Sequence, residues 1–208
     1  TYLTALQKGL QPNTLVLNDP ITLPPIGGRQ GGTPQIAYDD TGQEKDYWTP
    51  RNADGSSSGV YTMRFGLEHS VNIITAHLLD GGIDADPEQS LDDVCATAVA
   101  AKIYTDCVRY YPFVLGAQPV HMINLAAFYA AIANGGVRPQ PHAIDSIEKD
   151  GKTVFAYPKD PVFPKIGAAY PASFYQLKTK LQGVVARCTA LAIGALSPYV
   201  AGKTGTTE

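Results

Sequence analysis

Apolar residues recur every three or four positions in five separate stretches of the chain, and this helical periodicity constrains the fold more than any other feature. The stretches lie in residues 2–10, 63–78, 87–103, 119–136 and 173–185. The second of them fits one amphipathic helix or two short ones. An Asp150-Gly151 turn between β-prone runs predicts a hairpin, and residues 199–206 resemble a strand. Helices followed by a hairpin, another helix and a strand indicate an α+β fold rather than a doubly wound parallel sheet.

The fourth and fifth periodic stretches carry signals for their ends. The stretch at residues 119–136 is apolar almost all round, which predicts a buried helix that begins at Pro119 and ends at Asn134. Ser173 and Gln176 have the spacing of a capping box, so we expect the last helix to begin at Ser173.

The chain also contains one long irregular segment and few charged residues. Residues 19–58 are rich in Gly, Pro, Asp and Ser and predict a long loop within one partial domain that spans residues 1–208. The 208 residues are 44% apolar, enough for one good-sized domain or a domain that lacks a piece. Charged residues make up 17%, the net charge is −3 and no Lys/Arg run occurs, so nucleic acid is not an expected partner. The longest apolar runs are too short to cross a bilayer.

The three cysteines are too few and too scattered for a metal cluster or a disulfide framework. Cys95 and Cys107 could pair in an oxidising compartment, but two buried free thiols are the favoured interpretation. Cys188 receives no role. The histidines show no metal-ligand spacing, so neither a metal nor a cofactor is expected.

The segment "VAGKTGTTE" at residues 200–208 allows three interpretations. A phosphate-binding loop of the Walker A type would need a glycine where Ser197 stands, and Pro198 next to it has no N–H to offer a phosphate. A solvated terminal loop is the plain alternative. The third interpretation is a strand that lines a catalytic cleft with Lys203-Thr204-Gly205.

A second triplet, Ser70-Val71-Asn72, favours the catalytic interpretation. Alone, a Ser-x-Asn triplet is more often a helix cap than a catalytic pair. Active sites that combine S-x-x-K, S-D-N and K-T-G are known from penicillin-binding proteins and class A β-lactamases. Two of these three motifs occur here in the right order, more than a hundred residues apart.

The sequence around both triplets resembles the transpeptidase domain of class A (bifunctional) penicillin-binding proteins. "TMRFGLEHSVN" resembles the helix that leads into S-x-N, and "PFVLGAQPVHMINLAAFYAAIANGG" resembles the block between the motifs. "LQGVVARCTA" and "VAGKTGTTE" resemble the helix and strand that carry K-T-G, and "TYLTALQKGLQPNTLVLNDP" resembles the helix that follows the catalytic serine. The resemblance covers the whole chain and is weakest in the Gly/Pro-rich segment.

This resemblance implies a β-lactamase/transpeptidase-like fold, with an antiparallel sheet flanked by helices and incomplete at both ends. The nucleophilic serine and its lysine would lie upstream of Thr1. One literal S-x-x-K match remains at Ser146 to Lys149, but a strand next to the Asp150 turn would direct these two side chains to opposite faces. We therefore expect this match to be a decoy and the chain alone to be inactive.

The resemblance also implies an activity, which is cross-linking of peptidoglycan stem peptides that end in D-Ala-D-Ala through a serine acyl-enzyme. Ser70, Asn72 and Lys203 would be the catalytic residues present: Ser70 would relay a proton, Asn72 would hold the substrate backbone and the upstream lysine, and Lys203 would supply positive potential. Partners would be the stem peptides, β-lactam antibiotics and the remaining segments of the same protein. The implied cellular location is the periplasmic face of the bacterial inner membrane.

Three further residues would bind the substrate. The Thr204 and Thr206 hydroxyls would bind its terminal carboxylate, and the Thr206 N–H would form half of an oxyanion hole. Gly205 would leave room for a peptide along the strand edge. Two alternatives remain open, a serine β-lactamase and a non-catalytic relative that binds wall peptides or partner proteins. A β-lactamase would need an additional base for deacylation, and the chain has no Glu in a matching loop motif. An S-x-x-K motif upstream of Thr1 would support catalysis over the non-catalytic relative.

Overall fold

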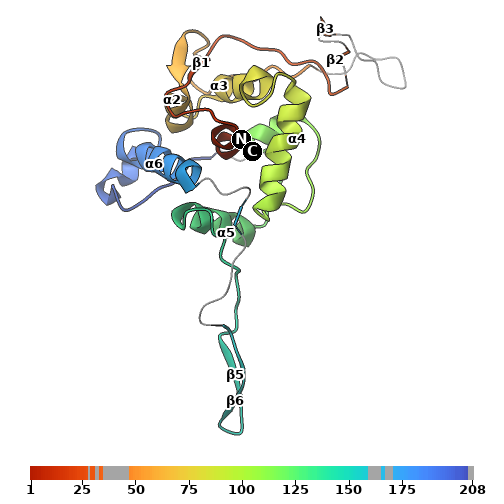
Figure 1. Cartoon of the computed structure of the whole chain (residues 1–208). Helices are drawn as coiled ribbons and strands as arrows, with labels where there is room; N and C mark the ends of the chain where they lie inside the picture. Colours follow the sequence, from red (N-terminus) through yellow and green to blue (C-terminus); the bar gives the residue numbers. More distant parts are fainter. Residues whose placement is uncertain (28, 31–32, 35–46, 159–164, 167–170, 206–208) are drawn as a thin grey trace.

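The structure is a computed structural model that describes residues 1–27, 29–30, 33–34, 47–158, 165–166 and 171–205 (Figure 1). Its α-helices are α1 (Tyr2–Gln7), α2 (Met63–Glu68), α3 (Asn72–His77), α4 (Pro87–Ala100), α5 (Met122–Ala133) and α6 (Pro171–Arg187). A π-helical turn, η1 (Leu78–Gly82), and two 3-10 helices, η2 (Tyr111–Leu115) and η3 (Leu191–Leu196), lie between or after them. The strands are β1 (Leu15–Leu17), β2 (Arg29–Gln30), β3 (Thr33–Pro34), β4 (Val60–Thr62), β5 (Ser146–Lys149) and β6 (Lys152–Ala156).

The strands pair antiparallel as β1–β4, β2–β3 and β5–β6, so the described part of the chain holds three two-stranded sheets. In the first pair Val16 lies opposite Tyr61, and β4 leads directly into α2. The hairpin β5–β6 projects away from the helices (Figure 1). Helices with small antiparallel sheets confirm the predicted α+β class, and the predicted hairpin at the Asp150 turn is confirmed as well.

Helix α6 packs against α1, α2 and α5, so it connects helices from the N-terminal and middle parts of the chain. Its apolar face, with Phe174, Leu177 and Leu181, is buried in the main core. Gly136, just after α5, lies against Phe174 so closely that a Cβ there would stand 2.6 Å from the ring. Helix α6 is therefore anchored in the main core along its apolar face.

The chain forms its helices where the sequence offers caps. The Thr62 side chain accepts a hydrogen bond from the Phe65 N–H at the start of α2. The Asp86 carboxylate accepts one from the Glu88 N–H at the start of α4, where Pro87 occupies the first helical position. The stretch at residues 63–78 is resolved as two short helices, α2 and α3, rather than one.

Two expectations about helix ends and burial are wrong. Helix α5 begins at Met122 rather than at Pro119, and Met122 is 84% exposed, so the helix is not buried all round in the described structure. Only its side with Ala127 and Ala131 faces the core. Helix α6 begins two residues before Ser173, which lies buried inside the helix and does not cap it.

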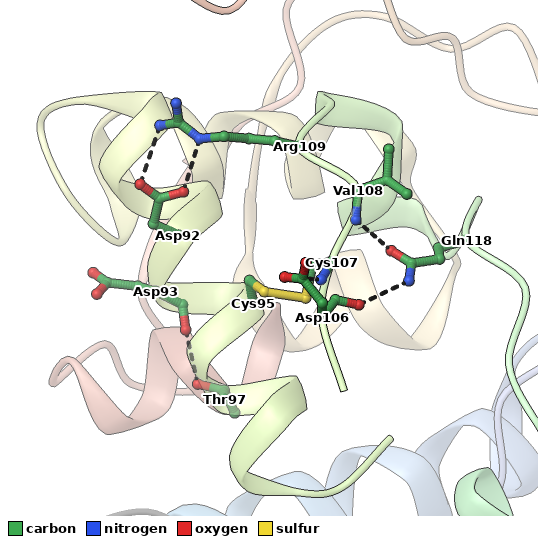
Figure 2. The surroundings of a disulfide bond; sticks show 9 residues. All are labelled: Asp92, Asp93, Cys95, Thr97, Asp106, Cys107, Val108, Arg109 and Gln118. Atoms are coloured by element: carbon green, nitrogen blue, oxygen red, sulfur yellow. Dashed lines mark hydrogen bonds and ion pairs between the residues drawn. A yellow bond between two sulfur atoms is a disulfide. The ribbon is translucent and has the colours of Figure 1, made fainter. Parts of the chain in front are cut away.

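The cysteines also differ from the favoured interpretation, because Cys95 and Cys107 form a disulfide (Figure 2). Helix α4 ends at Ala100, and Lys102 adopts a φ of 52°, which turns the chain back along the helix. The Cα atoms of the two cysteines thereby approach to 5.9 Å. Helical periodicity places Cys95 on α4 but carries no information on this reversal, so the sequence left the pairing open.

The strand expected at residues 199–206 does not form in its described part, residues 199–205. The Gly202 N–H donates instead to the carbonyl of Leu181 in α6, at 3.2 Å. Thr206 lies outside the described residues. No helix in the described residues has both the length and the apolar character to span a membrane.

Candidate active site

The turn between α2 and α3 presents Ser70 in a conformation that few residues adopt. Ser70 has a φ of 59°, in the left-handed region that non-glycine residues enter at a cost of about 1–3 kcal/mol. The Val71 N–H donates to the carbonyl of Gly66, which holds the turn closed. Gly66 is required there, because a Cβ would stand 2.5 Å from the Ile74 side chain. The tight approach of α2 to α3 thus fixes the position of Ser70.

Lys203 reaches this turn from the other end of the chain. Its Nζ donates a hydrogen bond of 2.8 Å to the Ser70 Oγ, across 133 sequence positions, and another of 3.1 Å to the Thr204 carbonyl. Burial lowers the pKa of Lys203 below its ordinary value. The structure therefore brings the two triplets of the sequence together at one place.

Asn72 is the first residue of α3 and is half-buried. Its Nδ2 donates to the carbonyl of Arg51 at 2.9 Å. The loop that precedes β4 thus holds the Asn72 side chain. Asn72 lies two residues after Ser70 in the sequence. The contact between the triplets is made by Ser70 and Lys203.

The three residues expected to bind substrate differ in what the structure describes. Thr204 is exposed, and its Oγ1 donates to the Thr189 Oγ1 at 3.0 Å. Gly205 is exposed, and a Cβ at this position would have no other atom within 4 Å. The space beside Gly205 is therefore open. Thr206 lies outside the described residues, so its expected role stays a prediction.

An ion pair connects α2 to α6 close to the Ser70 turn, between the buried Glu68 carboxylate and Arg187, whose side chain is 54% exposed. Glu68 is 3% exposed, and its carboxylate accepts from both nitrogens of the Arg187 fork, with a Nε to Oε2 distance of 3.0 Å. A Cβ at Gly183 would stand 2.1 Å from the Glu68 Oε1. The helices can approach this closely only because residue 183 has no side chain.

Lys180 adds an unusual charge to the same region. It is fully buried, and its Nζ makes no hydrogen bond within the described residues. The pKa of Lys180 is lowered to about 8, mainly by burial and also by the positive charge of Arg64, while the carboxylate of Glu68 partly opposes both effects. The α2–α6 contact therefore contains more positive than negative charge.

Sequence patterns do not predict the residues that connect the two triplets indirectly. The Thr189 Oγ1 accepts from Thr204 and donates to the Glu68 carbonyl at 3.4 Å, so it links the Lys203 segment to α2. A single threonine carries no recognisable signal. The glycine at position 183, in the middle of an otherwise periodic helix, is such a signal, because an interior glycine weakens a helix unless close packing requires it.

Cys188 lies at the edge of the site. Its Sγ is 3.7 Å from the Nε2 of His69, and the His69 ring stacks on Phe65 with 3.8 Å between centroids. Burial and the nearby Glu68 carboxylate raise the pKa of the Cys188 thiol, which makes it a weaker nucleophile at neutral pH.

Comparison with known proteins adds independent findings. The family model described as the penicillin binding protein transpeptidase domain matches residues 115–208. Penicillin-binding protein 1A of Rickettsia felis is 28% identical over 241 aligned residues, which cover 100% of this chain and 26% of that protein. Penicillin-binding protein 1A of Aquifex aeolicus is 31% identical over 175 residues, which cover 82% of this chain and 22% of that protein.

A solved structure agrees in fold. The crystal structure of penicillin-binding protein 1A from Haemophilus influenzae matches with a TM-score of 0.70 and 18% identity, over 93% of this chain and 31% of that chain. Together the fold, the family model and the paired triplets define the class of penicillin-binding transpeptidase domains. Residues 115–208 match this family, and the whole chain is similar in sequence to penicillin-binding proteins 1A. It spans about a quarter of the length of the relatives named above.

Proposed function

We propose that the full-length protein that contains this chain is a peptidoglycan D,D-transpeptidase that binds penicillin. One observation carries the proposal, namely the 2.8 Å hydrogen bond from the Lys203 Nζ to the Ser70 Oγ. Lysine in K-T-G and serine in S-x-N have no reason to meet across 133 positions in a chain that merely contains both triplets. The nucleophilic serine and its lysine lie upstream of Thr1 in this proposal.

The proposed reaction proceeds through an acyl-enzyme. The upstream serine attacks the carbonyl of the penultimate D-Ala, and the C–N bond to the last D-Ala breaks as this residue leaves with a proton on its amine. The amine of a neighbouring stem peptide then attacks the acyl-enzyme and releases the serine. Penicillins react at the same serine because their strained amide imitates D-Ala-D-Ala.

Ser70 supplies the proton for the leaving amine in this mechanism. An ammonium group has only donors, so the Ser70 Oγ accepts from Lys203 and its own O–H is free to point to the substrate. The nearby positive charge also stabilises the alkoxide that forms as the proton leaves, which makes Ser70 a better acid. Asn72 holds the substrate backbone and the upstream lysine.

The open side of Lys203 forms the place for the substrate. The Thr204 and Thr206 hydroxyls bind its terminal carboxylate. The peptide occupies the open space beside Gly205, which a side chain at this position would otherwise fill. The Thr206 N–H and the N–H of the upstream serine form the oxyanion hole. Removal of one such donor typically costs on the order of 3 kcal/mol in the barrier.

The proposed location is the periplasmic face of the bacterial inner membrane, with an anchor and a glycosyltransferase domain in the same protein. The Cys95–Cys107 disulfide supports this location, because disulfides persist in oxidising compartments and are rare in the cytosol. The partners are peptidoglycan stem peptides, β-lactam antibiotics and the remaining segments of the same protein, which supply the nucleophile helix and further strands.

Labelled penicillin tests the proposal. We expect the full-length protein to form a covalent adduct that survives denaturation, and digestion to place it on a serine upstream of Thr1. The 208-residue chain alone is expected to form none. A full-length protein that folds but acquires no label would refute the proposed function.

A further inference from the structure

Helix α3 begins without a capping side chain of its own. Its N-cap residue is Val71, which has no side-chain oxygen to accept from the first free N–H groups of the helix. The Ile73 N–H is one of these groups, and its hydrogen-bond partner is the Oδ1 of Asn52, at 3.0 Å and 21 positions earlier in the sequence. Asn52 thus takes the place of an N-cap from a different part of the chain.

The Asn52 side chain is buried and fixed from both ends. It is 7% exposed, and its Nδ2 donates to the Asn18 Oδ1 at 2.8 Å and to the Ser56 carbonyl at 2.7 Å. Asn18 is 2% exposed and donates in turn to the Ser58 carbonyl. Because the amide nitrogen is committed to these acceptors, the oxygen of Asn52 points at α3 in a single orientation.

The neighbouring residue holds the same helical turn by its backbone. The Arg51 carbonyl accepts from the Asn72 Nδ2, while Asn52 accepts from the next N–H in α3. Two consecutive residues of one loop therefore fix both the side chain of Asn72 and the backbone that carries it. Ser70 lies two residues before this turn, at its costly φ of 59°.

We propose that Asn52 is a positioning residue of the transpeptidase site, which acts by fixing the first turn of α3 and with it Asn72 and Ser70. The inference rests on the proposed function. Asn52 does not touch the substrate. Its replacement leaves the buried Ile73 N–H without a hydrogen-bond acceptor, and the first turn of α3 then shifts toward another acceptor. A displacement of about 1 Å in a catalytic group can reduce a rate by about 100-fold.

Three variants of the full-length protein separate positioning from stability. Asn52→Ala removes the acceptor for α3. Asn52→Asp keeps an oxygen for the Ile73 N–H but loses the donated hydrogen bonds to Asn18 and Ser56. Asn18→Ala is the matched control, because it removes a buried partner of Asn52 without touching α3. The measurements are the rate of acylation by labelled penicillin, the thermal midpoint, and hydrogen exchange of a peptide that covers residues 71–77.

We expect Asn52→Ala to acylate about 10- to 100-fold more slowly than the wild type at temperatures where both are folded. Asn18→Ala should remain within a few-fold of the wild type. Asn52→Asp should have a lower thermal midpoint, because its carboxylate would lie against the Ser56 carbonyl, but should acylate faster than Asn52→Ala. Exchange in residues 71–77 should accelerate most in Asn52→Ala. Equal losses of acylation in Asn52→Ala and Asn18→Ala, or unchanged exchange in Asn52→Ala, would overturn the inference. A wild-type protein that does not acylate would refute the proposed function, whereas the exchange data would still decide whether Asn52 fixes α3.

Discussion

The two sides of the candidate site are built in different ways. The Ser70 side is held by the close packing of α2 on α3, by the Glu68–Arg187 ion pair and by the loop that contains Asn52. The Lys203 side has no strand in residues 199–205 and is held by single hydrogen bonds, such as that from Thr204 to Thr189. The Ser70 side is therefore fixed by the core, whereas the Lys203 side is held by fewer contacts within the described residues.

The largest expected effect tests the Lys203 side. In the proposed mechanism the charge of Lys203 makes Ser70 a better proton donor, and Lys203→Ala in the full-length protein removes this charge. Proton transfer of this kind typically contributes about 10²- to 10⁴-fold to a rate. We expect acylation by labelled penicillin to fall by at least about 100-fold, with the thermal midpoint nearly unchanged because Lys203 is only half-buried.

The hairpin provides a matched control for this loss. Ser146 and Lys149 form the literal S-x-x-K match, but the structure places them on strand β5, where both are exposed. Lys149→Ala should therefore acylate as the wild type does. A loss with Lys149→Ala equal to that with Lys203→Ala would contradict the assignment of the site.

The next effect tests the fixed side. Gly183→Ala forces a methyl group to within 2.1 Å of the Glu68 Oε1 and separates α2 from α6. Overpacking of this kind costs about 1–3 kcal/mol, so urea unfolding should show a lower free energy of unfolding. Ala186→Gly in the exposed part of the same helix is the control and should cost no more than about 1 kcal/mol. If Gly183→Ala were the milder of the two changes, the close approach of the helices would be refuted.

The smallest effect concerns Lys180 and has a defined pH dependence. The pKa of Lys180 is about 8 in the folded protein and 10.5 ordinarily, so between these pH values the folded state binds fewer protons than the unfolded state. The contribution of Lys180 to the free energy of unfolding therefore rises with pH across this window, and below pH 8 the buried ammonium is fully destabilising.

Lys180→Met should remove this slope and stabilise the protein by about 1 kcal/mol or more at pH 7, since apolar replacements of buried charges often do so. Denaturation at a series of pH values, with Lys178→Met as the control on the same helix, measures the difference. A variant that is less stable than the wild type at pH 7 would show that the charge of Lys180 is compensated.

The sequence predicted the parts of the molecule that depend on local pattern or on a recognisable motif. The helices near Met63 and Pro87, the hairpin at Asp150, and the meeting of Ser70 with Lys203 belong to this group. The motif pair was decisive, because chemistry fixes the residue types on both sides of such a site whatever the intervening loops contain.

The features that the sequence did not predict depend on long-range packing. The Cys95–Cys107 disulfide requires a chain reversal at Lys102, which no periodicity announces. Helix α5 is apolar almost all round, yet only one side of it meets α6, so its burial could not be read from composition. The supporting residues Thr189 and Asn52 are common polar types whose roles arise only from the positions of distant partners.

The most direct test of the account is a crystal structure of the full-length protein acylated by penicillin. The account predicts that the Lys203 Nζ remains within hydrogen-bond distance of the Ser70 Oγ, that the penicillin carboxylate lies against Thr204, and that Asn52 still caps α3. A covalent adduct bound away from both triplets, or Lys203 and Ser70 on separate surfaces, would contradict it.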